Sequence, residues 1–401
     1  MTRWNVARRD LIVYFANSTW YGPAGTDRHI TRALSAHAPV LYVEPPVSML
    51  TALRNPAYAR SLAQAPPVEV LDERMARAVT TVAPGMTKRG LHHLTAPMVR
   101  RAVRGIVDGL IGPGREPVAA LVSCRAKPLW GALPARRRLF YATDDLPAGA
   151  ALLGEPRERL LRDEARTLRG ADVVAVVSPG LRERYAAGGH DAVVVPNGCL
   201  PAAYDGVDTA ALPDDVDLPG PIAGFVGYLN HRIDVSLLSA VARTGVSLLI
   251  VGPVVPGYDI SGLVSRPNVR WVGAKDFDEL PSYLRLIDVG LTPYADTEFN
   301  RASFPLKTLE YLAAGRRVVA TPLPANDWLG TDLIAVASGP AEFAARVERE
   351  VAAPRDSAPR RAFAQEHTWE RRAAVLAGLL GINRPAGTGP GSRSAPRAAD
   401  G

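Results

Sequence analysis

Cysteine and long apolar runs are scarce in this chain, and each shortage excludes a class of protein. Only Cys124 and Cys199 occur among 401 residues, and neither has the spacing of a zinc site or a disulfide framework, so we expect both to be small buried residues. Apolar runs such as Leu11–Ala16 fall far short of the roughly 20 residues that cross a bilayer. The first ten residues are polar and lack the apolar stretch of a secretion signal, which predicts a cytoplasmic protein.

Basic side chains exceed acidic ones, and the excess is unevenly placed. The formal net charge is +7, and residues 51–115 hold ten basic and four acidic side chains, a net of +6. One interpretation is a surface for an anionic membrane or an acidic acceptor, because each basic group near such a membrane contributes about 1 kcal/mol. The alternative is a general preference for arginine, since only 4 of the 47 basic residues are lysines. We expect no nucleic-acid partner.

Short apolar, β-branched runs alternate with helical patterns along the chain, which indicates βαβ units, parallel sheets and an α/β fold. In the first half, strands are expected at Leu11–Ala16, Val40–Glu44, Val79–Ala83, Val118–Ser123, Leu139–Thr143, Val173–Ser178 and Ala192–Pro196. In the second half, they are expected at Ile222–Gly227, Ser247–Gly252, Val269–Gly273, Val289–Pro293, Val318–Thr321 and Leu333–Ala337. The two groups predict two sheets.

A segment rich in Asp, Pro, Ala and Gly separates the two groups and is typical of a linker. The predicted organisation is an N-terminal domain over residues 1–204, a linker over 205–221 and a C-terminal domain over 222–365. An amphipathic stretch near the C-terminus predicts a helix broken near His367, with residues 366–383 crossing back to the N-terminal domain. The Gly-, Pro- and Ser-rich tail, 384–401, is expected to be disordered.

The most informative segment begins at Phe304 and ends at Gly315, just before a strand. Pro305 suits the first turn of a helix and Gly315 suits its end, so the pattern predicts a short helix. The free amides of its N-terminus, with roughly +0.5 of dipole charge, favour a bound phosphate. Lys307 can reach a diphosphate as a point charge, and Glu310 can accept hydrogen bonds from a ribose diol. The alternative is that both are ordinary exposed helix charges.

This segment resembles the donor-site helix of retaining family-four glycosyltransferases of the GT-B type, whose motif is a Glu, seven residues and a second Glu. Glu310 matches the second Glu, which contacts the ribose in that family, whereas Ala302 stands where the first Glu addresses the transferred sugar. A Pro-Leu-Lys entry to the helix is similar to a subgroup involved in teichuronic-acid-type and other bacterial surface polysaccharides. Further matching pieces over about residues 11–380 include Leu41-Tyr42-Val43-Glu44-Pro45-Pro46, Tyr141 with Asp144-Asp145, Glu164, Ala171-Asp172, Ser178, Pro196-Asn197-Gly198, Gly227-Tyr228-Leu229, Val251-Gly252-Pro253, Pro267-Asn268-Val269 and Thr368-Trp369.

The resemblance implies two Rossmann-like domains facing across a cleft, with the nucleotide sugar bound by the C-terminal one. Gly227 ends the first strand of that domain, where a phosphate can approach the backbone. Arg232 is expected to pair with the diphosphate, although Ile233-Asp234 replaces the family's Lys-Gly after it. The expected donor-binding residues are Gly227, Tyr228, Arg232, Gly252, Phe304, Pro305, Leu306, Lys307 and Glu310.

Acceptor contacts are expected in the N-terminal domain, around the long loop that follows the first strand. There the resemblance indicates Trp20, Gly25, Asp27, Arg28 and His29, with Trp20 able to stack on a sugar ring. For His29, a capping or core role is the alternative.

Two adjacent carboxylates, Asp144 and Asp145, follow the strand Leu139–Thr143 and are expected to point into the cleft. They suggest general-base work or hydrogen bonds to acceptor hydroxyls, and a helix cap at Asp144 is the alternative.

The sequence therefore predicts a glycosyltransferase that moves a sugar from a nucleotide-diphosphate donor to a hydroxyl of a carbohydrate, lipid-linked or small-molecule acceptor, with retention implied by the resemblance. Expected settings are bacterial polysaccharide, glycolipid or secondary-metabolite glycosylation. The expected catalytic residues are Asp144, Asp145, Arg232 and Lys307, and no metal or further cofactor is expected. The alternatives are a nucleotide-sugar epimerase or a phosphorylase on the same fold, or a non-catalytic nucleotide-sugar-binding partner. A dinucleotide oxidoreductase is disfavoured because no G-x-G-x-x-G opens a helix after a strand.

Overall fold

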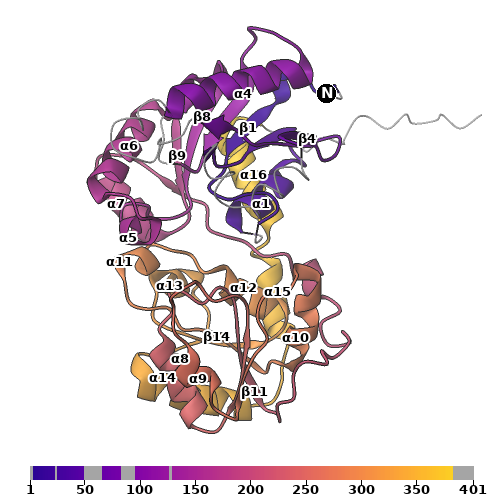
Figure 1. Ribbon diagram of the computed structural model, residues 1–401, viewed down its shortest axis with the longest axis vertical. Coiled ribbons are helices and arrows are strands. Elements are labelled where there is room, and N and C mark those ends of the chain that lie inside the picture. Colours follow the sequence, from indigo (N-terminus) through magenta and orange to yellow (C-terminus); the bar gives the residue numbers. More distant parts are fainter. Residues whose placement is uncertain (1–2, 23–24, 49–65, 83–94, 126–128, 383–401) are drawn as a thin grey trace, which may run out of the picture.

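The computed structural model describes residues 3–22, 25–48, 66–82, 95–125 and 129–382, which fold around two sheets (Figure 1). The first sheet has the strand order β10-β9-β8-β7-β1-β2-β5-β4, and the second has the order β13-β12-β11-β14-β15-β16. All pairs in both sheets are parallel except β4 with β5, and β3 pairs with β6 in a small separate sheet. The predicted α/β class and its two sheets are confirmed.

The strands of the first half are β1 (Ile12–Phe15), β2 (Val40–Val43), β3 (Val47–Ser48), β4 (Val68–Val70), β5 (Met75–Ala78), β6 (Thr81–Val82), β7 (Val118–Ser123), β8 (Ala135–Ala142), β9 (Val173–Val176) and β10 (Val193–Val194). Those of the second half are β11 (Ile222–Val226), β12 (Ser247–Val251), β13 (Val269–Trp271), β14 (Val289–Thr292), β15 (Arg317–Ala320) and β16 (Ile334–Val336). The described α-helices of the first half are α1 (Thr26–Leu34), α4 (Thr95–Ile111), α5 (Ala150–Leu153), α6 (Arg157–Gly170) and α7 (Pro179–Ala187). Those of the second half are α8 (Val235–Arg243), α9 (Ser261–Val264), α10 (Leu280–Leu286), α11 (Glu298–Arg301), α12 (Leu306–Ala313), α13 (Pro324–Leu329), α14 (Gly339–Ala352), α15 (Ala358–Gln365) and α16 (Trp369–Leu379). Short 3₁₀ helices are η1 (Arg8–Asp10), η3 (Trp130–Ala132), η4 (Pro201–Tyr204) and η5 (Phe277–Glu279).

Strand β1 shows why apolar runs mark the sheets, because both of its faces are covered. Ile12 and Tyr14 pack in the cluster that contains α1 and α16, whereas Val13 and Phe15 pack against α4. Successive side chains of a strand point to opposite faces, so a strand covered on both sides reads as an unbroken apolar run. In the second half, every expected strand overlaps an observed strand in sequence.

Strand β5 was not predicted, and Arg77 is the reason. This arginine interrupts the apolar pattern, yet its side chain is only 3% exposed. Its guanidinium donates to Glu44 Oε1 at 2.5 Å and to Glu69 Oε2 at 2.7 Å, and these partners make its burial tolerable. The strand expected at Val79–Ala83 was placed in the wrong sheet, since the structure forms only β6 there, paired with β3.

The C-terminal segment breaks between α15 and α16, around His367. Thr368 caps α16 by accepting a hydrogen bond from the Arg371 amide at 3.3 Å. Helix α16 then lies beside α1 in the N-terminal half of the molecule (Figure 1). Trp369, 1% exposed, stacks on the His29 ring with centroids 5.6 Å apart. The chain therefore passes from the second sheet back to the first at this helix.

Both cysteines are buried and free, as predicted. Among the residues that the structure describes, no helix combines the length and apolar character needed to span a membrane. Four basic residues of the segment 51–115 lie outside the described residues, namely Arg54, Arg60, Lys88 and Arg89. The tail, 384–401, lies outside them too.

Candidate functional site

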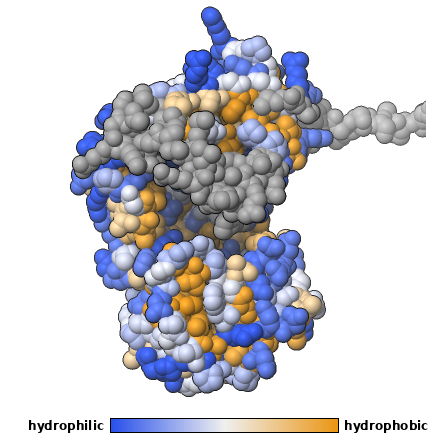
Figure 2. Space-filling view, viewed as in Figure 1, coloured by the Kyte–Doolittle hydropathy of each residue, from blue (hydrophilic) through white to orange (hydrophobic). Residues whose placement is uncertain are grey.

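A pocket of about 390 Å³ lies between the two sheets, at the ends where their parallel strands finish. Figure 2 shows the narrowing between the two halves of the molecule, and the pocket takes residues from both of them. The N-terminal half contributes Asn17, Ser18, Gly25, Thr26, Asp27, Thr143, Asp144 and Asn197. The C-terminal half contributes Arg232, Tyr294, Ser303, Phe304, Pro305, Leu306 and Lys307.

A cavity of similar size, about 430 Å³, lies at the other edge of the first sheet. It is lined by residues that precede β1 and β2, among them Arg9 and His37, and by Arg136 at the start of β8. This edge holds the beginnings of the strands and takes no residue from the second sheet. The pocket between the halves is therefore the better candidate for a reaction that joins two substrates.

Helix α12 directs its N-terminus at the pocket, since Pro305, Leu306 and Lys307 all line it. Pro305 is the N-cap, with φ −66° and ψ 118°, one position earlier than the first-turn place that the sequence indicated. Tyr311 anchors the helix to the second sheet by accepting a hydrogen bond from the Val226 amide at 2.8 Å. Gly315, at φ +74°, ends the helix in the left-handed conformation that glycine tolerates.

Lys307 and Glu310 form an ion pair within α12, with Nζ 2.9 Å from Oε2. Burial of Lys307 opposes its charge, but the carboxylate of Glu310 outweighs this effect and raises the pKa of Lys307 above its ordinary value. Lys307 is therefore cationic at neutral pH. Glu310 itself is not among the pocket residues, and its carboxylate pairs with Lys307.

Arg232 reaches the pocket from the loop after β11. Its Nε donates to Asn300 Oδ1 at 3.0 Å and its Nη2 donates to Ser303 Oγ at 3.1 Å. The guanidinium carbon also lies 4.8 Å from the centre of the Phe299 ring and 5.4 Å from that of Tyr294. These neighbours hold the guanidinium in one orientation and carry no negative charge. The positive charge of Arg232 is therefore available to an anion in the pocket.

The remaining predicted donor residues are Gly227, Tyr228 and Gly252. A Cβ at Gly227 would come 3.6 Å from Lys307 Cε, so this glycine lies beside the lysine. Gly252 has φ +136°, and a Cβ there would stand 2.8 Å from the carbonyl carbon of Gly227 and closer still to its oxygen. Tyr228 is 46% exposed. None of these three residues lines the pocket.

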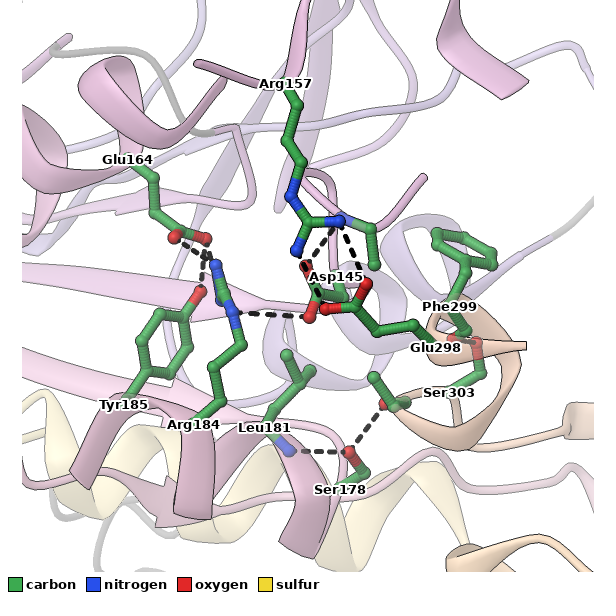
Figure 3. A network of polar contacts seen from close by, with 12 residues as sticks. Asp145, Arg157, Glu164, Ser178, Leu181, Arg184, Tyr185, Glu298, Phe299 and Ser303 are labelled. Atoms are coloured by element: carbon green, nitrogen blue, oxygen red, sulfur yellow. Dashed lines mark hydrogen bonds and ion pairs between the residues drawn. The ribbon is translucent and has the colours of Figure 1, made fainter. Parts of the chain in front are cut away.

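The adjacent carboxylates Asp144 and Asp145 have separate environments, contrary to the expectation that both face the cleft. Asp144 lines the pocket. Burial raises the pKa of Asp144 to about 6, although nearby Arg232 lowers it, while the charges of Asp27 and Asp145 raise it further. Asp145, 2% exposed, accepts a hydrogen bond from the Ala148 amide at 3.0 Å and lies 3.3 Å from Arg184 Nε (Figure 3). Asp145 therefore stabilises a turn.

Of the predicted acceptor residues, Gly25 and Asp27 line the pocket. The carboxylate of Asp27 is occupied, because it accepts from Tyr14 Oη at 3.0 Å, from the Asn17 amide at 2.6 Å and from the Ser18 amide at 3.1 Å. It holds the loop after β1 in place and has little capacity left for a substrate.

Trp20, Arg28 and His29 do not reach the pocket. Trp20 is 6% exposed and its ring is covered by Arg32, whose guanidinium carbon lies 5.1 Å from the ring centre, so no face remains for a sugar. Arg28 donates to the Trp20 carbonyl at 3.2 Å. Burial lowers the pKa of His29, whose ring packs against Trp369. His29 is therefore a core residue, which was the alternative to an acceptor contact.

Sequence reasoning missed Asn197, which joins the two halves at the pocket. Its Nδ2 donates to the Phe304 carbonyl at 2.6 Å, and its Oδ1 accepts from Thr26 Oγ1 at 2.8 Å. Ser303, Asn300 and Thr143 were missed as well. Single amides and hydroxyls carry no periodic signal, and only the Pro196-Asn197-Gly198 match pointed to one of them.

Comparison with known proteins identifies the class of the C-terminal half. Residues 220–352 match the family described as glycosyl transferases group 1. These residues contain the second sheet, helix α12 and Arg232, so the chain carries a glycosyl transferases group 1 domain.

A curated relative matches a longer part of the chain. A protein of Bacillus subtilis (strain 168), named as the teichuronic acid biosynthesis glycosyltransferase TuaH, is 32% identical over 216 residues. That alignment covers 50% of this chain and 54% of the relative, so the chain spans about half the length of the curated relative that it matches.

Solved structures resemble nearly the whole chain. A sucrose-phosphate synthase from Thermosynechococcus elongatus has a TM-score of 0.70 at 17% identity, over 92% of this chain and 98% of its own. Anabaena HepE, solved in complex with UDP and glucose, has a TM-score of 0.61 at 16% identity, over 92% and 99%. The trehalose-6-phosphate synthase OtsA has a TM-score of 0.63 at 13% identity, over 92% and 98%. The predicted GT-B fold is confirmed.

Proposed function

We propose that this protein is a glycosyltransferase, which moves a sugar from a nucleotide-diphosphate donor in the C-terminal half to a hydroxyl of an acceptor in the N-terminal half. The observation that carries the proposal is a wall of positive groups on one side of a pocket between the halves. Arg232, Lys307 and the N-terminus of α12 form this wall. A diphosphate is the part of such a donor that requires cations and free amides.

The proposed chemistry breaks the bond between the anomeric carbon and the diphosphate oxygen, and the bonding electron pair stays on the diphosphate. Negative charge therefore grows beside Lys307 and Arg232, which are fixed before the reaction by Glu310, Asn300 and Ser303. Preorganised positive groups lower the barrier because they need no reorganisation as charge develops. The acceptor oxygen forms the new bond to the anomeric carbon.

Asp144 is the carboxylate that we assign to the acceptor hydroxyl. It lines the pocket, whereas the carboxylate of Asp27 is occupied by backbone and side-chain donors. With a pKa of about 6, Asp144 is mostly ionised at neutral pH and still basic enough to accept the hydroxyl proton. Retention of configuration is proposed on the resemblance to the family, with Ala302 leaving no carboxylate at the position of the family's first Glu.

The relatives suggest the setting of the reaction. We propose polysaccharide biosynthesis, because the Bacillus subtilis relative is named for teichuronic acid biosynthesis. A UDP-sugar is the first donor to test, because HepE was solved with UDP-glucose. We also propose a cytoplasmic location with contact to an anionic membrane surface, which the positive net charge of residues 51–115 supports.

Substitution of the ion pair in α12 tests the donor site. We expect Lys307→Ala to weaken nucleoside diphosphate binding about tenfold, because a hydrogen bond to a charged group contributes roughly 1.5–3 kcal/mol. Glu310→Ala should weaken it as well, because Lys307 loses the carboxylate that fixes its ammonium group. Calorimetry with UDP, GDP and dTDP measures the dissociation constants. Lys275→Ala is the matched control, since Lys275 pairs with Asp215 at 2.7 Å and does not line the pocket. Unchanged affinity in both variants refutes this role.

Ala302 favours one second candidate, a partner protein that binds the nucleotide sugar without catalysis. Incubation of the protein with donor and a panel of acceptors distinguishes the two, because only a transferase releases nucleoside diphosphate in step with glycosylated product. Incubation with donor alone tests the epimerase alternative, which would yield an isomer of the sugar.

A further inference from the structure

A short stretch of the C-terminal half, residues 298–304, contacts the N-terminal half at several points, and we name it the bridging segment. It comprises α11 and the turn before α12, with Thr297 capping α11 by accepting from the Asn300 amide at 3.2 Å. Figure 3 shows this segment against side chains from α6 and α7. The same segment also holds Arg232, so two sets of contacts meet in seven residues.

Three polar contacts tie the bridging segment to the N-terminal half. Arg157 donates to both carboxylate oxygens of Glu298 at 2.9 Å. Ser178 Oγ donates to the Ala302 carbonyl at 2.6 Å. Asn197 Nδ2 donates to the Phe304 carbonyl at 2.6 Å. These contacts lie at both ends of the segment and between them, so the N-terminal half contacts the segment at three separated positions.

Phe299 makes the corresponding apolar contact, against Gly149 at the start of α5. A Cβ at Gly149 would stand 2.8 Å from both Cδ2 and Cε2 of the Phe299 ring, closer than carbon atoms approach. The φ of Gly149 is −82°, which any residue adopts. The glycine is therefore needed for the approach of the other half, and its own backbone conformation does not require it.

The N-terminal side of this contact is braced by a buried polar network. Arg184 pairs with Asp145 and with Glu164, and Tyr185 Oη donates to Glu164 at 2.7 Å (Figure 3). The network connects the turn before α5 with α6 and α7, the elements that carry Gly149, Arg157 and Ser178. Through its pair with Arg184, Asp145 helps to hold in place the surface that contacts the bridging segment.

On its other side, the bridging segment positions Arg232. Asn300 Oδ1 and Ser303 Oγ accept from the guanidinium, and Asn300 Nδ2 donates back to the Arg232 carbonyl at 2.9 Å. Ser303 Oγ in turn donates to the Phe299 carbonyl at 2.9 Å. The Phe299 ring lies under the guanidinium, whose carbon is 4.8 Å from the ring centre. Phe299 therefore touches Gly149 of one half and Arg232 of the other.

We propose that the bridging segment couples docking of the two halves to the orientation of Arg232, with Phe299 as the positioning residue. When the halves separate, Phe299 loses the surface at Gly149, and the exposed Arg157–Glu298 pair offers little resistance. The guanidinium then loses the fixed ring beneath it. This inference rests on the proposed function, in which Arg232 binds the donor diphosphate. Its consequence is that the donor is held firmly only when the acceptor half is in place.

Gly149→Ala tests the coupling, because the added methyl group pushes on Phe299 without straining the backbone. Gly105→Ala is the matched control, since a Cβ at that position of α4 meets nothing within 4 Å. We expect Gly149→Ala to weaken binding of UDP, or of GDP or dTDP where calorimetry shows one of them to bind better, by about fivefold, the lower range of coupling between two sites. Binding to Gly105→Ala stays within about twofold of the original protein, as for distant independent changes.

A double-mutant cycle with Arg232→Gln decides whether the effect passes through the arginine. We expect Gly149→Ala to change affinity less than about twofold in the Arg232→Gln background. Equal losses in both backgrounds, or no loss in the original protein, overturn the coupling. Phe299→Leu provides a second variant that keeps a core-compatible side chain, and its loss should not add to that of Gly149→Ala.

The same cycle separates this inference from the proposed function. If Arg232→Gln weakens diphosphate binding while Gly149→Ala and Phe299→Leu do not, the donor contact stands and the coupling is wrong. If Arg232→Gln leaves diphosphate affinity unchanged, the assigned donor contact is wrong and the coupling with it.

Discussion

The pKa of Asp144 leads to a sharp prediction for the pH dependence of sugar transfer. Burial raises this pKa from 3.8 to about 6. If the ionised carboxylate accepts the proton of the acceptor hydroxyl, kcat/KM follows the ionised fraction of Asp144. That fraction is about nine tenths at pH 7 and about one tenth at pH 5, so activity should fall about tenfold. A carboxylate with the ordinary pKa would stay more than about nine tenths ionised at pH 5, and activity would hardly change.

Release of nucleoside diphosphate, followed at saturating donor between pH 4.5 and 8, measures this profile. The neighbour Arg232 provides a second comparison, since its charge lowers the pKa of Asp144. In Arg232→Gln, the acidic limb should therefore move to higher pH while the overall rate falls. Asp144→Asn should be slow, by roughly 10²-fold or more, and should lose the acidic limb. An original protein that works equally well at pH 5 and pH 7 refutes the assignment.

Unfolding does not confuse this experiment as far as Asp144 is concerned. Its pKa is higher in the folded than in the unfolded chain, so the folded state binds the proton more tightly. The ionised form costs stability above pH 6, and this cost is relieved as the pH falls from about 6 towards 4. Loss of activity near pH 5 with an unchanged circular dichroism spectrum would therefore report on the carboxylate in the pocket.

Two further predictions concern stability. Gly252→Ala should destabilise the fold by about 3 kcal/mol or more, because a Cβ there collides with backbone at φ +136°. The control Gly262→Ala, with open space around the added methyl group, should change the stability by no more than about 1 kcal/mol in thermal unfolding. Equal unfolding midpoints for the two variants contradict the argument. Glu44→Gln should lower the free energy of unfolding in urea by roughly 3 kcal/mol, because it removes one carboxylate from buried Arg77 and leaves only Glu69. A loss below about 0.5 kcal/mol would mean that the pair is dispensable.

The fold was largely predictable because its signals are local. Strands covered on both faces need unbroken apolar runs, and such runs marked β11 to β16 and most of the first sheet. Strand β5 escaped because a buried charge interrupts it, and the compensating carboxylates lie 8 and 33 residues away along the chain. No pattern within a short window of sequence reveals such a partner.

Site residues were predictable only where a charged side chain stands at a helix start or after a strand end. Lys307 and Arg232 line the pocket because a helix start and a strand end place them there. Asp144 and Asp145 have the same type of side chain at adjacent positions, yet only one faces the pocket. Their separation is decided by Arg184 and by the turn that follows β8.

The sequence alone determined the two sets of parallel strands, the short helix at residue 306 and its cationic first turn, since periodicity, proline and glycine act within a few residues. Tertiary structure decided which polar side chains are free to meet a substrate. Trp20 is covered by an arginine, Asp27 is occupied by a loop, and Arg232 is held by a segment that the other half grips. The reason is physical: a buried polar group takes whichever partners the fold brings to it, and those partners lie far away in the sequence.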